Sequence, residues 1–345
     1  MTTSETEEER PGDEKKSCWS DIPVDILCEV ADRVPYWDLF RFATVCKTWR
    51  LAIYRVHLPQ RSTLLVPYLL SYTCIRERDE YIEFYDLHGE TYKYPIDSER
   101  QLFGGTSRLY ARKFGWLLLK KLELPFEQFY LFNPFWNLVV LLPPLELELG
   151  FQVVLATFTS SPIRGCVILV IARRYGSNDH IINTCKLPKF DWSVHKTRCQ
   201  GSVEGVAYLD GIFYCVVPKI IDDLNSLSLS ISTFNIALQA WVMDYASTTL
   251  QHHTRSSAFC VVESDGKLLL AVRDEPVLLI YQFDWLRKDW IRVQNLGNHV
   301  LLLDHSSSIA CPTLGRDSKF SNKIFHLDWG KEPFTFSGNG VWRRP

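Results

Sequence analysis

One short pattern recurs through most of the chain and constrains its fold more than any other feature. An aromatic or aliphatic residue precedes Asp or Asn, and a large apolar residue follows six positions after that polar residue. The polar residues of the five matches are Asp86, Asn133, Asn235, Asp284 and Asp328. They are separated by 47, 102, 49 and 44 residues, and Lys186 takes the polar position near the middle of the long interval. The spacing predicts about six repeated units of roughly 48 residues each.

The repeated units are predicted to consist of short β-strands. Segments such as "GWLLL", "DGIFYCVV" and "DGKLLLAV" are apolar and follow Gly or Asp-Gly turns. Residues 54–345 are therefore predicted to form an all-β propeller of about six blades. A sandwich pair or a solenoid would also fit this length, but neither predicts a turn that recurs at a near-constant period. The residues six positions after the turn should separate neighbouring blades, and the indoles among them are Trp192, Trp241 and Trp290.

The N-terminal part has a different pattern. Residues 1–17 are acidic and almost without apolar side chains, which predicts a disordered tail. Residues 18–53 show helical spacing, with Pro23 in a first turn and an apolar stripe through Leu27 and Val30. Three short helices of this size bury little apolar surface on their own. Their apolar stripe therefore packs either against the larger domain or against a partner, and periodicity does not decide between the two.

The residues of this helical segment resemble the F-box. Its pattern of Leu-Pro-x-Glu-Leu-Leu, then Asp-Leu, then Val-Cys-x-x-Trp-Arg is matched by "IPVDIL" at 22–27, "DL" at 38–39 and "VCKTWR" at 45–50. The resemblance implies docking onto a Skp-type adaptor and, through it, onto the cullin and RING subunits of a ubiquitin ligase. It assigns the adaptor contact or its direct support to Ile22, Pro23, Ile26, Leu27, Val30, Leu39, Val45 and Trp49.

The propeller segment is similar to a kelch repeat, which also has a Tyr-Asp turn with Trp six residues later. The Gly-Gly doublet of kelch strands is missing, since Gly104-Gly105 is out of phase with the repeat. Together with segments such as "FYLFNPFWNLVVLLPPLE" and "VEGVAYLDGIFYCVV", the whole chain resembles the large plant family that joins an F-box to a degenerate kelch-like β-propeller.

No catalytic constellation is evident in the sequence. Motifs for serine hydrolases, nucleotide loops and zinc proteases are absent. His252-His253 has no further ligand at metal spacing, and Asp304-His305-Ser306 reads as a turn because adjacent strand residues face opposite sides. We therefore expect no enzyme activity, no metal and no cofactor. A propeller enzyme is the weakest of the functional alternatives.

The net charge and the cysteines indicate which partners and which cellular compartment to expect. The net charge is -2, which gives no reason to expect nucleic acid or a membrane surface as a partner. The ten cysteines form no C-x-x-C, so we expect reduced thiols and neither disulfides nor zinc. The absence of a signal peptide or a long apolar run predicts a cytoplasmic or nuclear protein that is not secreted.

Two functions remain open at this stage. The first is the substrate-recognition subunit of an SCF-type (Skp–cullin–F-box) ubiquitin ligase, in which the propeller binds an unknown target protein. The second is a stoichiometric binder or inhibitor of a signalling enzyme, with ubiquitination incidental. Trp136, Trp285 and Trp329 fall in or beside the repeated turns, and they are the candidate target-binding residues. The alternative is that each indole folds back over its own hairpin.

Overall fold

The computed structural model divides the chain into two compact units, Met1–Ser62 and Thr63–Pro345. The residues that it describes are 19–33, 42, 45–49, 51–52, 69–70, 74–75, 81–85, 91–95, 106–122, 126–133, 138–162, 165–198, 201–221, 226–250, 259–274, 277–304, 308–313, 315–326, 334–337 and 341–343. The predicted tail at 1–17 lies outside them. No helix among these residues is long and apolar enough to cross a membrane.

The first unit is helical. The 3-10 turn η1 (Trp19–Asp21) leads into helix α1 (Val24–Arg33), whose first turn is closed by a hydrogen bond from Leu27 N to Pro23 O at 3.1 Å. Pro23 therefore precedes the helix, where its missing N–H costs nothing. Further helical residues lie at 42, 45, 47–49 and 51–52. Leu27, Ala31, Phe42 and Ala52 form the buried side of the unit.

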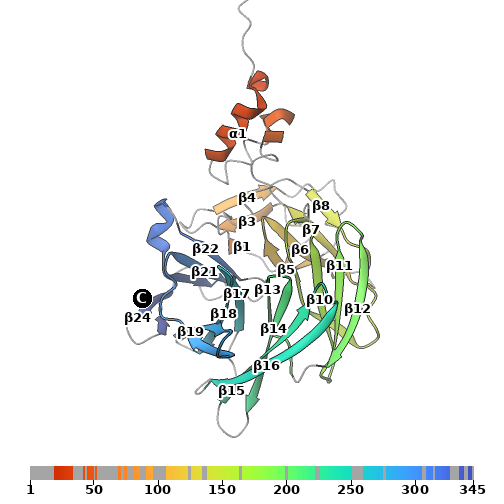
Figure 1. Cartoon of the computed structure of the whole chain (residues 1–345). Coiled ribbons are helices and arrows are strands. Elements are labelled where there is room, and N and C mark those ends of the chain that lie inside the picture. The colour runs from red at the N-terminus through yellow and green to blue at the C-terminus, as the bar shows by residue number, and fades with distance from the viewer. Residues whose placement is uncertain are drawn as a thin grey trace, which may run out of the picture. The chain divides into compact units, whose positions relative to one another are not determined.

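The second unit consists of β-sheets (Figure 1). The first sheet contains β1 (Leu69–Leu70), β3 (Tyr81–Tyr85) and β4 (Thr91–Pro95). The second contains β2 (Cys74–Ile75), β5 (Ser107–Lys113), β6 (Trp116–Lys121), β7 (Gln128–Asn133) and β8 (Leu138–Leu141).

The third and fourth sheets are four-stranded antiparallel meanders. The third contains β9 (Phe151–Phe158), β10 (Val167–Arg174), β11 (Asp179–Lys186) and β12 (Asp191–Arg198). The fourth contains β13 (Gly205–Leu209), β14 (Ile212–Ile221), β15 (Ser226–Asn235) and β16 (Ala240–Leu250).

The fifth sheet has nine strands. They are β17 (Phe259–Ser264), β18 (Lys267–Asp274), β19 (Val277–Asp284), β20 (Asp289–Arg292), β21 (His299–Leu303), β22 (Ile309–Pro312), β23 (Lys323–His326), β24 (Phe334–Ser337) and β25 (Val341–Arg343). The 3-10 helix η4 (Gly315–Phe320) lies between β22 and β23.

The expectation of about six separate blades is wrong for the described strands, which pair into five sheets. The four-residue β20 pairs only with the second half of β19, from Tyr281 to Asp284. β25 pairs with the first half of β19, where Trp342 lies opposite Leu278, and it also pairs with β24. This pairing joins the strands β17–β20 and β21–β24 into one sheet.

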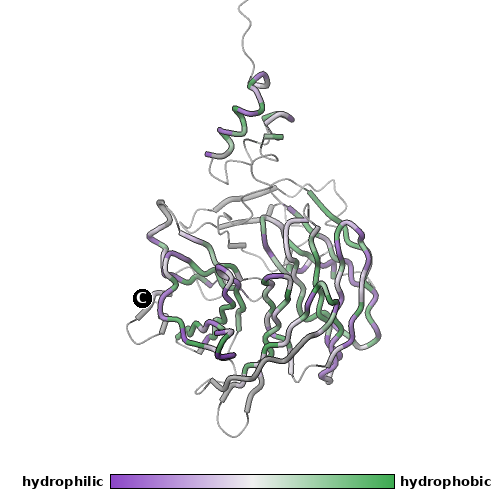
Figure 2. The backbone as a smooth tube through the Cα atoms, viewed as in Figure 1, coloured by the Kyte–Doolittle hydropathy of each residue, from purple (hydrophilic) through white to green (hydrophobic). Residues whose placement is uncertain are grey.

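The sheets pack face to face through strands that are apolar on both sides. In β10, Ile168 and Val170 pack against the β5–β8 sheet, whereas Val167, Leu169 and Ile171 pack against β13–β15. Alternate residues of a strand point to opposite faces, so each face of β10 meets a different neighbouring sheet. Figure 2 shows hydrophobic (green) segments along many strands of the second unit. This arrangement explains the uninterrupted apolar run "GCVILVIA".

One strand from each of four successive sheets lies next to a strand of the neighbouring sheet, as expected near the axis of a propeller. Contacts join β5 to β9, β9 to β13 and β13 to β17, and β17 also contacts β22 of its own sheet. Gly205 begins β13, and a Cβ atom built there would clash with Cγ2 of Val261 on β17 and lie 3.2 Å from its Cβ. Gly205 therefore permits the close approach of these two strands.

Replacing Gly205 with Ala should lower the free energy of unfolding by about 1–3 kcal/mol, because Val261 is buried and cannot move away freely. Urea denaturation measures the loss. The double change Gly205→Ala with Val261→Ala is the control, and it should cost less than the sum of the two single changes. Strictly additive costs would show that the two residues do not compete for the same space.

The repeated turns have the structure that the sequence pattern predicts. Oδ1 of Asn235 accepts hydrogen bonds from the backbone N–H groups of Ala237 and Leu238, at 2.9 and 3.1 Å. Oδ1 of Asp284 accepts bonds from Leu286 and Arg287 in the same way, at 2.8 and 3.1 Å. The side chain of the first residue thus fixes each turn. The turn positions Asp86 and Asp328 lie outside the described residues.

The predicted role of the three repeat tryptophans between blades is confirmed. Trp290 is buried in the cluster between β13–β15 and β17–β20, and its ring lies 5.2 Å from that of Phe283. Trp241 is half-buried and packs against the cluster between β9–β11 and β13–β15. Trp192 packs against the cluster between β5–β7 and β9–β11, and its Nε1 donates a hydrogen bond to Pro143 O at 2.9 Å.

A buried histidine gives the second unit a defined response to acid. His180 Nδ1 donates a hydrogen bond to Asn178 O at 2.9 Å, and Nε2 has no hydrogen-bond partner among the described residues. Burial lowers the pKa of His180, and the charge of Arg173 acts in the same direction, while Asn178 and Asp179 oppose it.

We expect the free energy of unfolding to fall as the pH drops below about 6.5, the ordinary pKa of histidine. In that range the unfolded chain takes up a proton at His180 that the folded chain does not, so the slope contributed is at most about 1.4 kcal/mol per pH unit. Denaturation between pH 7.5 and 5 measures it. His180→Gln should have a shallower slope, and an identical slope in both proteins would contradict the prediction.

Candidate protein-binding surfaces

Helix α1 of the first unit has an exposed apolar stripe. Ile26 and Val30, one helical turn apart, are 56% and 43% exposed. Leu27 and Ala31 on the neighbouring face are buried, at 1% and 0% exposure. An ordinary surface helix turns its apolar residues inward, so an apolar stripe left outside the core indicates a protein-binding surface.

The indole of the "VCKTWR" segment, Trp49, contacts two aromatic neighbours. Nε1 of Trp49 donates a hydrogen bond to Trp19 O at 2.9 Å. The ring of Trp49 lies 4.3 Å from Phe42 and 6.2 Å from Trp19. Trp19 itself is largely exposed and is not among the residues assigned to the adaptor contact. Its position four residues before Pro23 was the available signal.

The residues assigned to the adaptor contact differ in exposure. Pro23, Ile26, Val30 and Val45 are exposed, Ile22 and Trp49 are half-buried, Leu27 is buried and Leu39 lies outside the described residues. A buried Leu27 stabilises the packing of α1 and presents little surface to a partner. The exposed residues of α1 are therefore the better candidates for direct contact.

In the second unit, Trp285 packs over its own hairpin and is also partly exposed to solvent. Its ring lies 4.8 Å from Phe283 of its own hairpin and 5.0 Å from Tyr214 of β14 in the adjacent sheet. The side chain nevertheless remains 38% exposed, and the next residue, Leu286, is 97% exposed. Trp285 is thus a partly exposed aromatic residue held in a fixed position. Trp136 and Trp329 lie outside the described residues.

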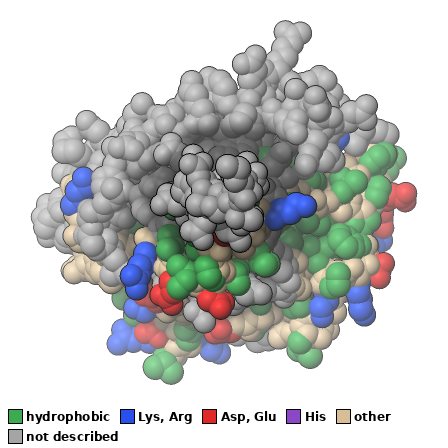
Figure 3. All heavy atoms as spheres, turned by 90° about the horizontal axis from the view of Figure 1, so that it is seen from above, with side chains coloured by type: hydrophobic (Ala, Val, Ile, Leu, Met, Phe, Trp, Pro, Cys, Tyr) green, Lys and Arg blue, Asp and Glu red, His purple; other side chains and the backbone are tan. Residues whose placement is uncertain are grey.

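Other exposed apolar residues are spread among charges. Leu238 occupies the turn between β15 and β16 and is exposed, as are Val194 of β12 and Ile291 of β20. On the face seen in Figure 3, hydrophobic side chains lie among Lys, Arg, Asp and Glu. These residues give no indication of a binding site dominated by one sign of charge.

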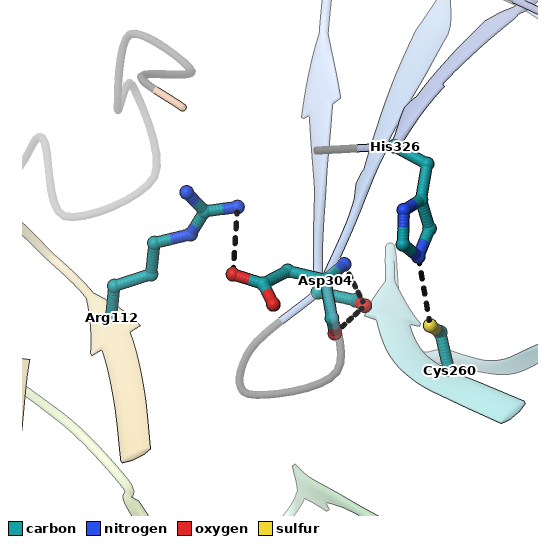
Figure 4. Close-up of polar contacts among 5 residues, drawn as sticks. Arg112, Cys260, Asp304 and His326 are labelled. Carbon is teal, nitrogen blue, oxygen red and sulfur yellow. Dashed lines mark hydrogen bonds and ion pairs between the residues drawn. The ribbon is translucent and has the colours of Figure 1, made fainter. Parts of the chain in front are cut away.

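A polar cluster lies in the interior of the second unit (Figure 4). Arg112 belongs to β5, Cys260 to β17 and His326 to β23, and Asp304 directly follows β21. Nη2 of Arg112 and Oδ2 of Asp304 are 3.9 Å apart, and both side chains are buried. Burial lowers the pKa of Arg112, while the charge of Asp304 raises it. Sγ of Cys260 lies 4.0 Å from Nε2 of His326.

The hydrogen bonds around Asp304 indicate that this polar cluster supports the fold. Asp304 N donates to Ser308 Oγ at 3.1 Å, and that hydroxyl donates to Asp304 O at 3.0 Å. The predicted turn at Asp304 is therefore closed by local hydrogen bonds, although His305 and Ser306 lie outside the described residues. Within the described part of the chain, no three His, Cys, Asp or Glu side chains are placed to hold a metal. His252 and His253 also lie outside it.

Both units match known families. The family model described as "KIB1-4 beta-propeller" matches residues 84–342, and the F-box domain model matches residues 19–61. The chain belongs to the KIB1-4 β-propeller family. The resemblance to plant F-box proteins with a propeller is thereby confirmed.

Two plant proteins and a solved propeller structure are similar to this KIB1-4 propeller chain. An F-box/kelch-repeat protein of Arabidopsis thaliana is 25% identical over 362 residues, covering 96% of this chain and 95% of the relative. An F-box protein of the same plant is 26% identical over 208 residues, covering 59% of this chain and 52% of the relative. Among solved structures, the Dos1 propeller has a TM-score of 0.38 and 9% identity, covering 63% of this chain and 64% of that one.

An F-box joined to a KIB1-4 propeller is an architecture of substrate-recognition proteins of SCF type. F-box domains generally bind Skp-type adaptors, and proteins of this architecture are typically adaptors without catalytic activity of their own.

Proposed function

We propose that this chain is the substrate-recognition subunit of an SCF-type ubiquitin ligase. The observation that carries the proposal is the exposed stripe of Ile26 and Val30 on the F-box helix, beside buried Leu27. An F-box that folded only to support its own chain would have no use for such a stripe. A Skp-type adaptor, presenting apolar helices, buries it.

The contribution of the protein to the reaction is placement. The F-box attaches the chain to the adaptor, cullin and RING subunits, and the propeller holds a target near the ubiquitin-charged enzyme. Holding two reactants together raises their effective concentration without any covalent step by the chain itself. This role requires neither a metal nor a cofactor.

On the propeller, Trp285 and Leu286 are the proposed target contacts. Trp285 is fixed by Phe283 and Tyr214, so ordering it on binding costs little conformational entropy. Partly exposed aromatic residues of this kind are frequent anchors in interfaces. Trp136 and Trp329 stay in the proposal on their sequence positions alone.

Reconstitution tests the proposed function. Proximity labelling in cells with blocked proteasomes identifies the candidate target, and the purified ligase with this chain is then assayed for transfer of ubiquitin to it. Transfer that requires this chain is the expected result. A target that binds tightly but is never ubiquitinated would favour the stoichiometric inhibitor instead.

Trp285→Ala with Leu286→Ser is the matched variant for the target contact. Leu286 is almost fully exposed and Trp285 lies outside the buried cluster of these strands, so the fold should stay intact and adaptor binding should be unchanged. Ubiquitination of the target should fall. Val194→Ser on β12, which is also exposed, is the control and should leave ubiquitination of the target unchanged.

A further inference from the structure

The edge of β19 is shared by two short strands. β20 covers the half from Tyr281 to Asp284, and β25 covers the other half through the pairing of Leu278 with Trp342. On its other side, β25 pairs with β24 along its whole length, from Ser337↔Val341 to Thr335↔Arg343. Three residues of β25 therefore form the described backbone link between the strands β17–β20 and β21–β24.

The side chain of Trp342 fills the space between the same two strand groups. It is 0% exposed and is among the largest fully buried side chains of the described residues. Its hydrophobic cluster draws on both groups. The members from β17–β19 are Cys260, Val262, Leu269, Ala271, Leu278 and Ile280, and those from β21 and β23 are Leu301, Leu303 and Ile324.

We propose that β25 is a strap that couples the β17–β20 strands to the β21–β24 strands, with Trp342 as its anchor. Three backbone-paired residues provide few hydrogen bonds, so burial of the indole must supply most of the free energy that keeps β25 attached to the sheet. When the strap detaches, the first half of β19 loses its edge partner, and within the described residues the two groups remain joined only by side-chain packing such as that of β17 against β22.

β25 pairs with the start of the strand that leads to the hairpin of Trp285. β19 ends at Asp284, the residue that fixes the turn carrying Trp285 and Leu286, and this end of the strand pairs with β18 and β20. This inference concerns the fold and does not require the proposed ligase function.

Hydrogen–deuterium exchange of the full chain under native conditions tests the strap. Trp342→Ala should increase exchange about tenfold or more in β19 and in β21–β24, and much less in β9–β16. Trp116→Ala is the matched control, since Trp116 is also buried but belongs to β6 and the cluster with β9–β11. It should increase exchange in β5–β8. A uniform increase across all sheets with Trp342→Ala would overturn the proposal.

An engineered crosslink supplies a second test on one protein. Leu278 and Trp342 lie directly opposite each other in an antiparallel pair, a geometry that permits a disulfide after Leu278→Cys with Trp342→Cys. The oxidised form should restrain β19 and β24 together, whereas the reduced form should exchange fast in both. Equal exchange in the two forms would also overturn the proposal.

A milder variant covers the case in which these proteins fail to fold. Trp342→Phe keeps an aromatic ring but leaves part of the space unfilled. The rates of hydrogen exchange in β19 and β21–β24 of this variant should lie between the wild-type rates and the rates expected when β25 is detached. Exchange identical to the wild type at every one of these strands would contradict an anchoring role for the indole.

Discussion

Replacing Ile26 and Val30 with Asp should abolish binding to a Skp-type adaptor and leave the propeller folded. Both side chains are exposed, so the change disturbs the F-box core little. In the complex it removes two buried apolar groups, each contributing roughly 1.5–3 kcal/mol, and it places carboxylates in an apolar contact. A loss of affinity of about 100-fold or more should follow, as measured by calorimetry or pull-down.

Two further variants on α1 make this result interpretable. Glu29→Ala removes only an exposed ion pair with Arg33 at 3.7 Å, and it should bind the adaptor normally. Leu27→Asp is unsuitable as a binding probe, because Leu27 is buried and its replacement would unfold the F-box. Wild-type affinity of the Ile26→Asp, Val30→Asp protein would exclude the stripe as the docking surface.

Replacing Trp290 with Ala should destabilise the propeller by about 3–5 kcal/mol, a large part of the stability of a typical domain. Trp290 is 5% exposed and lies in the cluster that joins two sheets, with Phe283 against its ring. Its removal leaves a cavity that the sheets on both sides cannot close easily. Thermal and urea denaturation should both show the loss.

The neighbouring residue provides the control for Trp290. Ile291 follows on the same strand with its side chain on the opposite, exposed face, so Ile291→Ala should change the melting temperature little. Trp241→Ala should cost less than Trp290→Ala, because Trp241 is only half-buried. An unchanged melting temperature for Trp290→Ala would show that its indole does not separate the sheets.

The repeated turn was predictable from sequence because it is a local structure. Asn235 and Asp284 satisfy backbone N–H groups two and three residues later, so their effect needs no knowledge of the rest of the fold. The burial of Trp290 followed from the same spacing. Helical periodicity predicted one apolar stripe through Leu27 and Val30, but the structure buries Leu27 and exposes Ile26 and Val30, because spacing alone does not fix which apolar residues the unit keeps inside.

The features that were not predicted depend on residues far apart in the chain. The pairing of Leu278 with Trp342 joins two strands of very different length, and three residues carry too weak a pattern to specify a strand. Nothing near Arg112 in sequence points to Asp304. The merger of two strand groups into one sheet, and hence the number of sheets, follows from such distant pairings.

In the turns fixed by Asn235 and Asp284, different residues hold the backbone and face the solvent. In the β15–β16 and β19–β20 turns, the first residue secures the backbone, while the side chains of Leu238 and Leu286 are largely exposed to solvent. Side chains at these tips can therefore be exchanged at little cost to stability. A turn of this kind tolerates substitution at its tip while the paired strands stay unchanged.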